Sequence, residues 1–365
     1  MTSTAAARVE NAATRFYRRF TRGLRRLVPF LHRPTSAIQA RFHYNPEVVD
    51  MGDEGGDRVR GIFSPRYDPA VVRQYIQPQF LEYAETYSTK YDHFDFHKWL
   101  LTTAFSRLNL DGPKSKGLKI LDIGSGSGNT IIPLLELCPD AEVLGTDLSL
   151  EIMVLLKQAL LGKGLARQCY LLQLNAEELD FQSGTFDLVV GAAILHHLLC
   201  PELAIAGCAK ILKKGGQAIF FEPFQEGFVE LRDAYLDILN HPSADSLTPQ
   251  ARHFFQAMIN DINVRLGTDK SAPIYRQLDD KWLFPRAYFE ELARKHGFAG
   301  CTIYTLHEND SQLEKETEVL VKLAIQQPRE GVPDWAWDIL KKHDDAIPKD
   351  KKPDCLLEAC VMFHN

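Results

Sequence analysis

A glycine-rich turn constrains the fold of this chain more than any other feature of its sequence. The turn Gly124–Gly128 (GSGSG) follows the apolar run Leu118–Ile123 and precedes Thr130–Cys138, which has the spacing of a helix. A strand, a glycine turn and a helix in this order are typical of folds that bind nucleotides at the carboxyl edge of a parallel sheet. Glycine suits such a turn because it adopts positive φ and lets a ligand approach the backbone. The GxGxG spacing differs from the GxGxxG of dinucleotide enzymes.

The alternation of strands and helices continues after this turn. Further strands are predicted at Glu142–Thr146, Tyr170–Leu174, Phe186–Val190, Gln217–Glu222, Cys301–Leu306 and Leu356–Phe363. Further helices are predicted at Leu150–Leu161, Pro201–Leu212, Pro285–His296, 311–326 and 333–343. Short apolar strands separated by helices predict an α/β fold, with a mostly parallel sheet covered by helices on both faces. Residues 224–284 are mostly helical and interrupt the alternation, so we expect them to form an insertion or lid.

The region before the turn divides into two parts. Residues 1–61 are predicted to be a basic leader and linker that is poorly ordered, and 62–112 a helical cap; the main domain is expected to span 113–365. The cap contains many aromatic residues and a histidine, among them Tyr83, Tyr87, Tyr91 and His97. These side chains fit a cover over a ligand site, but for any single one of them an ordinary place in a helix-packing core is the favoured interpretation.

The leader is strongly basic. Residues 1–41 hold nine arginines and one glutamate, a net charge of +8, and the chain's total of −6 leaves −14 for the rest. Phe16, Phe20, Leu24, Leu27 and Leu31 recur at helical spacing among these arginines. The pattern is compatible with a helix on an anionic membrane, with a mitochondrial transit peptide, or with a leader without function of its own. The expected location is cytoplasmic, with membrane association or a mitochondrial location as the alternatives.

Composition excludes several classes of protein. No stretch approaches 18 uninterrupted apolar residues, so a membrane-spanning helix is not expected. Seven cysteines without a CxxC pair indicate a reducing compartment and no structural zinc. The net charge of −6 and the acidic main domain argue against general binding of nucleic acid.

An acidic residue stands where such folds bind a ribose. Asp147 follows the strand Glu142–Thr146 and lies 25 residues after Asp122. A carboxylate at this strand end can accept hydrogen bonds from both hydroxyls of a ribose. The alternative is a tight turn with an ordinary helix cap. That alternative leaves the joint occurrence of a strand, a glycine turn, a helix and an acidic residue without a functional reason.

Five blocks of this sequence resemble a known family. LDIGSGSG, GTDLS, QLNAEEL, FDLVVGAAILHHL and LKKGGQAIFFEP occur between about 118 and 223 in the order found in class I S-adenosylmethionine-dependent methyltransferases. The resemblance implies a Rossmann-like sheet of seven strands whose last strand is antiparallel. It implies S-adenosylmethionine as the cofactor.

The resemblance also implies which residues bind that cofactor. They are Asp122, Gly124, Ser125, Gly126, Gly128, Asp147, Leu148, Asn175, Ala176 and Ala192. Asp122 and the glycine backbone would surround the methionine part, Asp147 would hold the ribose, and Asn175 would meet the adenine edge. Many relatives have aspartate in place of Asn175, and the amide keeps one acceptor oxygen for an amino group.

Three residues are candidates for catalysis. His196 and His197 follow the strand Phe186–Val190 at the expected lip of the pocket, and Glu222 ends the strand Gln217–Glu222. Histidine titrates near neutral pH and suits the role of general base, but adjacent side chains seldom share a direction. A scaffold role for the histidines and a capping role for Glu222 are the alternatives.

These observations favour methyl transfer to a small or lipid-like acceptor, through an oxygen, nitrogen or carbon atom. No (D/N)PP(Y/F) block follows the strand Phe186–Val190, which lowers the prospect of base amines or glutamine amides as acceptors. The alternatives are a methyltransferase-like binding or assembly factor without turnover and a protein methyltransferase. The sequence leaves the oligomeric state open.

Overall fold

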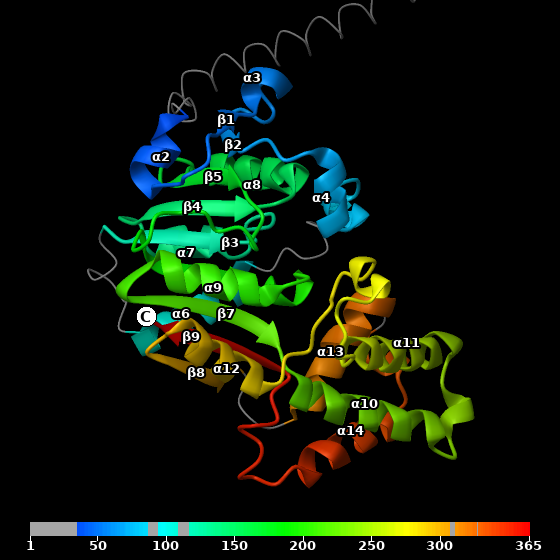
Figure 1. Ribbon diagram of the computed structural model, residues 1–365. Coiled ribbons are helices and arrows are strands. Elements are labelled where there is room, and N and C mark those ends of the chain that lie inside the picture. Colours follow the sequence, from blue (N-terminus) through cyan, green and yellow to red (C-terminus); the bar gives the residue numbers. More distant parts are fainter. Residues whose placement is uncertain (1–34, 87–93, 109–116, 307–310, 327) are drawn as a thin grey trace, which may run out of the picture.

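The computed structural model describes residues 35–86, 94–108, 117–306, 311–326 and 328–365. The Arg-rich segment 1–34 lies outside these residues, as do Tyr87 and Tyr91, so the expectations for them stay predictions. A nine-stranded sheet forms the centre of the described chain, in the order β1-β2-β5-β4-β3-β6-β7-β9-β8 (Figure 1).

The strands of this sheet agree closely with the predicted ones. They are β1 (Val49–Asp50), β2 (Ile62–Ser64), β3 (Lys119–Ile123), β4 (Glu142–Asp147), β5 (Cys169–Gln173), β6 (Phe186–Ala192), β7 (Leu212–Pro223), β8 (Gly300–Thr305) and β9 (Glu358–His364). Neighbouring strands from β2 to β7 pair in parallel, and β9 runs antiparallel to both β7 and β8. The predicted α/β class with an antiparallel last strand is therefore confirmed.

The predicted number of seven strands was wrong, because the N-terminal segment adds two. Strand β2 pairs in parallel with β5, and β1 pairs antiparallel with β2. The preceding helix α2 (Ser36–Phe42) buries Ile38 and Phe42 completely, and α3 (Gly52–Gly55) follows β1. Residues 35–61 are therefore not a poorly ordered linker. Their few apolar side chains extend the core, although the glycines between them interrupt the alternation of apolar and polar residues by which a strand is predicted.

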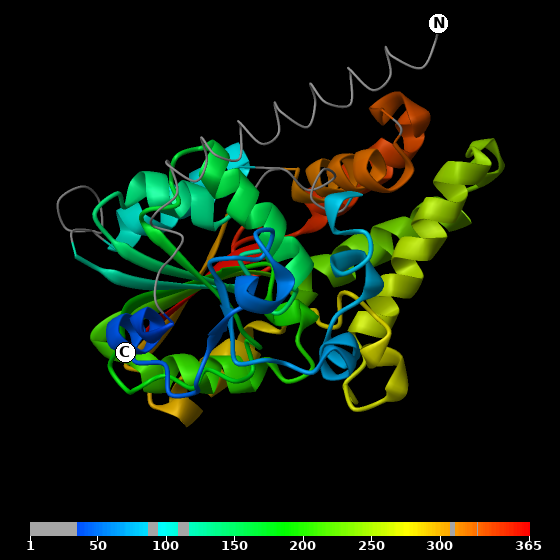
Figure 2. The same cartoon turned by 90° about the horizontal axis from the view of Figure 1, so that it is seen from above.

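Helices cover both faces of the sheet. One face packs against α6 (Phe94–Leu108), α7 (Ile131–Leu137) and α8 (Leu150–Gly162) in one apolar cluster. The other face packs against α2, α9 (Pro201–Ile211) and α12 (Arg286–His296) in a second cluster. Figure 2 shows both layers from above, beside the sheet. Helix α6 thus belongs to a helical layer and not to a separate cap, which corrects part of the prediction for 62–112.

A helical bundle forms a third apolar cluster next to the sheet. Its helices are α10 (Gln225–Asn240), α11 (Pro249–Arg265), α13 (Gln312–Ile325) and α14 (Asp334–Ala346), and they lie together in Figures 1 and 2. The hydroxyl groups of Tyr235 and Thr317 join α10 to α13 over 3.0 Å. The predicted insertion 224–284 is present, but it shares its core with the segment between β8 and β9. Among the described residues, no helix combines the length and apolar character that a bilayer crossing needs.

Candidate active site

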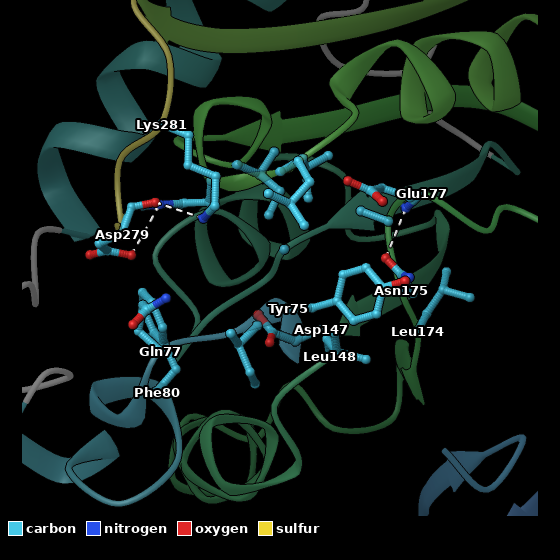
Figure 3. Close-up of a pocket in the computed structure, with 17 residues that line it drawn as sticks. Tyr75, Gln77, Phe80, Asp147, Leu148, Leu174, Asn175, Glu177, Asp279 and Lys281 are labelled. Carbon is cyan, nitrogen blue, oxygen red and sulfur yellow. Dashed lines mark hydrogen bonds and ion pairs between the residues drawn. The ribbon is translucent and has the colours of Figure 1, made fainter. Parts of the chain in front are cut away.

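A cavity opens at the carboxyl ends of the parallel strands (Figure 3). It encloses about 570 Å³ of empty space, part of which is open to solvent. Its lining comprises Tyr75, Ile76, Gln77, Phe80, Gly124, Asp147, Leu148, Leu174, Asn175, Ala176, Glu177, Ile194, His197, Leu198, Leu199, Asp279 and Lys281. The strand ends form its floor. The other walls come from α4 (Pro69–Tyr75), the short helix η1 (Pro78–Phe80) and the last part of the insertion 224–284, which contributes Asp279 and Lys281.

The glycine turn has the backbone geometry that its sequence predicts. Gly124, Gly126 and Gly128 adopt φ values of 68°, 53° and 121°. A Cβ at Gly124 would lie 2.6 Å from Cδ1 of Ile194, which also lines the cavity. A Cβ at Gly126 would meet no atom within 4 Å, so only its φ requires glycine there.

Asp147 is bonded to the glycine turn. Its Oδ2 accepts a hydrogen bond from the backbone N–H of Gly126 over 3.0 Å, and its Oδ1 accepts one from Ser149 over 2.9 Å. Burial raises the pKa of this carboxyl, and the two backbone donors oppose that rise. Each carboxylate oxygen keeps a further lone pair, so Asp147 can still accept hydrogen bonds from a diol.

Asp122 carries a buried carboxyl group. Its side chain is completely buried, and neither oxygen has a hydrogen-bond partner within the part of the chain that the structure describes. Burial raises its pKa from 3.8 to about 7. Buried polar atoms are rarely left unsatisfied in proteins, so these two oxygens suit a cationic donor such as an ammonium group.

Part of the cavity lining is apolar. Leu148, Leu174 and Ala176 line the cavity together with Asn175. The Asn175 amide oxygen accepts a hydrogen bond from the backbone N–H of Glu177 over 3.1 Å, and its amide nitrogen donates to Glu178 over 3.1 Å. One lone pair of that oxygen is left for an amino group of a bound base.

The predicted cofactor residues divide into two groups. Gly124, Asp147, Leu148, Asn175 and Ala176 line the cavity. Asp122, Ser125, Gly126, Gly128 and Ala192 lie outside that lining. The Ser125 side chain bonds to the backbone of the neighbouring strand: its hydroxyl oxygen accepts a hydrogen bond from the N–H of Thr146 over 3.0 Å.

The two adjacent histidines have different environments. His197 lines the cavity, and its Nδ1 lies 3.1 Å from the carbonyl oxygen of Asp279. Its ring packs edge-on against Phe80 at a centroid distance of 5.8 Å. His196 is only 7% exposed and does not line the cavity. The expectation that at most one histidine faces the pocket therefore agrees with the described lining.

Glu222 holds the loop that carries these histidines. It is 1% exposed, and its Oε1 accepts hydrogen bonds from the N–H groups of Ile194 and Leu195 over 3.1 and 2.8 Å. Its Oε2 lies 3.2 Å from the backbone nitrogen of His196 and 2.7 Å from its Nδ1. Ala193 in this loop has a φ of 53°, so the bonds to Glu222 hold a strained turn.

His196 also contacts the insertion. Its Nε2 lies 3.4 Å from Oδ1 of Asp280. Burial alone would lower the pKa of His196, but the charges of Glu222 and Asp280 and their hydrogen bonds raise it to about 10. Burial would raise the pKa of Asp280, but hydrogen bonding to His196 and the charges of both histidines hold it below its usual range.

Sequence reasoning missed the residues that reach the cavity from other elements. Tyr75, Gln77 and Phe80 come from α4 and η1, and Asp279 and Lys281 come from the insertion. The amide nitrogen of Gln77 donates to the carbonyl oxygen of Arg276 over 2.9 Å and so joins these two walls. No motif surrounds these residues, so no pattern in the sequence marks them.

Comparison with known proteins agrees with this geometry. Residues 120–216 match the model of a family described as a methyltransferase domain. A ubiquinone/menaquinone biosynthesis C-methyltransferase of Stutzerimonas stutzeri is 32% identical over 123 residues, which is 33% of this chain and 48% of that protein. A phosphatidylethanolamine N-methyltransferase of Cereibacter sphaeroides is 30% identical over 110 residues, or 30% and 53% of the two chains.

Solved structures of low sequence identity are also similar. A phosphoethanolamine N-methyltransferase 2 of Haemonchus contortus, in complex with S-adenosyl-L-methionine, has 16% identity and a TM-score of 0.41 over 72% of this chain and 51% of that one. This chain spans about half the length of the first curated relatives that it matches. The matched segment holds the glycine turn, Asp147, Asn175 and both histidines. Residues 120–216 of this chain therefore form a methyltransferase domain.

Proposed function

We propose that this chain is a methyltransferase that transfers the methyl group of S-adenosylmethionine to a small or lipid-like acceptor. One observation carries the proposal: the glycine turn and the Asp147 carboxylate are bonded to each other at the edge of one cavity. A turn and a carboxylate with only structural roles would not need an open cavity beside them. The unsatisfied oxygens of Asp122 behind the turn support the same proposal.

The described residues fit the parts of this cofactor. Asp147 would accept hydrogen bonds from the ribose hydroxyls, and Asn175 would bind the adenine edge between Leu148 and Ala176. Asp122 lies two residues before Gly124, where the turn begins, and its carboxylate suits the amino group of the methionine part. When bound, the cofactor supplies a methyl group on a positively charged sulfur.

The protein's own part in the reaction is alignment, exclusion of water and removal of a proton. His197 is the candidate base that lines the cavity, because its ring reaches the lining and an imidazole nitrogen can accept a proton. Gln77 joins the two walls above the strand ends, which limits access of water to the cavity. We assign Glu222 and His196 a positioning role, since they hold the loop of His197 and do not line the cavity.

The acceptor class follows from the cavity wall and from the matched relatives. The wall is partly apolar, and α4, η1 and the loop with Asp279 and Lys281 enclose the strand ends as they would around a small molecule. The names of the matched relatives include acceptors of this kind, in ubiquinone biosynthesis and phospholipid methylation. Contact of the Arg-rich leader with an anionic membrane would suit a lipid-like acceptor and is part of this proposal.

A labelled cofactor tests the proposal. The full-length protein is incubated with methyl-labelled S-adenosylmethionine and a cell extract, and the label is followed into small-molecule, lipid and protein fractions. We expect label in the small-molecule or lipid fraction with the wild type and a strong loss with Asp147→Ala. Cofactor binding without any transferred label would indicate a binding factor, and label in protein would indicate a protein methyltransferase. A folded protein that does not bind the cofactor at millimolar concentration would refute the proposal.

A further inference from the structure

Three potential ligand atoms converge beside the cavity in a way that methyl transfer alone does not explain. They belong to His196 and His197 in the loop after β6 and to Asp280 in the insertion. One atom from each residue lies within 4.8 Å of the other two. Oδ1 of Asp280 lies 3.4 Å from Nε2 of His196 and 3.4 Å from Nδ1 of His197.

These separations match the spacing of ligands around a metal ion. Nitrogen and oxygen ligands bind Zn²⁺ at about 2.0–2.2 Å, so two ligands of a tetrahedral ion are about 3.4 Å apart. Two of the three pairs in this cluster have that separation before any ion is bound. Two imidazoles and one carboxylate are a donor set that first-row divalent metals accept.

Neighbouring groups orient two of the three ligands, His196 and Asp280, as a metal site requires. The buried carboxylate of Glu222 lies 2.7 Å from Nδ1 of His196, which leaves Nε2 to face Asp280. Metal-binding histidines commonly donate their second ring nitrogen to a carboxylate in this way. Oδ2 of Asp280 lies 3.5 Å from a terminal guanidinium nitrogen of Arg265, which orients the carboxylate from its other side.

The backbone joins the two segments that supply the ligands. The N–H of Lys281 donates to the carbonyl oxygen of His196 over 2.8 Å. This bond holds Asp280 beside the histidine loop, although the two segments are about 80 residues apart in sequence. The two segments are therefore joined directly beside the cluster.

We propose that His196, His197 and Asp280 bind a divalent first-row transition-metal ion, of the class of Zn²⁺ and Mn²⁺. Because His197 lines the cavity, an ion held by these residues would stand beside a molecule bound there. Its remaining coordination positions would suit an oxygen atom of such a molecule. The proposal goes beyond the methyltransferase function and does not depend on it.

Metal titration of the full-length protein tests the proposal without any cofactor. Protein freed of metal with a chelator is titrated with Mn²⁺ and then with Zn²⁺ by calorimetry, and folding is verified by circular dichroism. Mn²⁺ is the primary probe because it avoids the thiolates that attract Zn²⁺. We expect one ion per chain, bound at least tenfold more weakly by Asp280→Asn and His197→Ala, and weakened about 10- to 100-fold by Glu222→Gln.

His296→Ala is the matched control. His296 is also paired with a carboxylate, Glu202 at 3.1 Å, but at a different place on α12. We expect its metal affinity to equal that of the wild type. A folded wild type that binds neither ion at millimolar concentration would show that the cluster is an ion-pair network only. Binding that persists at full strength in both Asp280→Asn and His197→Ala would assign the ion to other donors and would equally overturn the proposal.

Discussion

The backbone N–H of Gly126 donates a hydrogen bond over 3.0 Å to Oδ2 of Asp147, and this bond joins the turn after β3 to the end of β4. Two elements that are 21 residues apart in sequence thus form one edge of the cavity. The bond explains why a glycine at 126 and a carboxylate at 147 belong to one site. It also makes the two residues testable as a pair.

Asp147→Ala should weaken cofactor binding by roughly 1–3 kcal/mol, because a ribose hydroxyl then loses a charged acceptor. Calorimetric titration with S-adenosylmethionine measures the change. Asp140→Ala serves as the control, since Asp140 is exposed and lies before β4, away from its carboxyl end. Equal affinities for Asp147→Ala and the wild type would contradict a ribose-binding role.

Gly124→Ala should lower both stability and cofactor affinity. Its φ of 68° is unfavourable for alanine, and the new Cβ would lie 2.6 Å from Ile194 in the cavity wall. We expect a loss of about 1–3 kcal/mol in the free energy of unfolding, measured in urea. The control Gly162→Ala, at the end of α8, adds a Cβ that meets no atom within 4 Å and should be neutral or slightly stabilising.

The pH dependence of cofactor binding should follow Asp122, whose pKa burial raises to about 7. The ionised carboxylate attracts an ammonium group, so affinity should fall as the pH decreases through 7. Asp122→Asn should bind more weakly and lose this pH dependence. Calorimetric titrations between pH 5.5 and about 8.5 span that pKa and measure both effects. An unchanged pH profile in Asp122→Asn would assign the dependence to another group.

The same carboxyl should affect the stability of the cofactor-free protein with the opposite sign. Between about pH 4 and 7 the folded state binds a proton that the unfolded state releases, so stability falls as the pH rises through this window. Asp122→Asn should be more stable than the wild type above pH 7, by roughly 2–4 kcal/mol at most. Urea unfolding at pH 4.5 and 8 measures the difference, and equal differences at both values would disprove the assignment.

Glu222→Gln should destabilise the protein by roughly 3 kcal/mol, because it breaks a buried pair with His196 and replaces an acceptor of backbone N–H groups. Chemical unfolding measures the loss. Glu290→Gln removes an exposed i,i+4 pair with Arg286 and should cost less than about 1 kcal/mol. Similar losses in the two variants would show that Glu222 does not hold the histidine loop.

Gln77→Ala should speed the release of the cofactor about three- to tenfold, because one hydrogen bond between the two cavity walls is lost. Stopped-flow displacement measures the dissociation rate. Gln256→Ala removes a surface hydrogen bond to Asn260 on α11 and should leave the rate unchanged. An unchanged rate in Gln77→Ala would mean that the bond between the walls does not limit release.

The parts of this site that the sequence predicted correctly are local. The turn Gly124–Gly128 follows β3 directly, and Asp147 ends the next strand, so a span of about 25 residues contains strand, turn, helix and acid. Within such a span, the order of the elements already places the carboxyl ends of adjacent parallel strands at one edge.

The parts that sequence reasoning missed or misjudged depend on distant contacts. Strands β1 and β2 are too short to show a period, and they exist because β5 offers an unpaired edge to β2. The bundle combines two segments separated by β8, and neither one alone shows its partner. Glu222 was expected at the pocket, but the strained turn at Ala193 draws its oxygens to the backbone of Ile194 and Leu195.

The sequence by itself determined the α/β class, the strand-turn-helix that reaches the cavity and the carboxylate beside it, because neighbouring residues produce these features. Only the tertiary structure decided that His197 lines the cavity while His196 lies between Glu222 and Asp280. It also brought Gln77 to Arg276, about 200 residues later in the chain. Hydrogen bonds of this kind form where packing of the whole chain brings donors and acceptors together, and no local pattern encodes them.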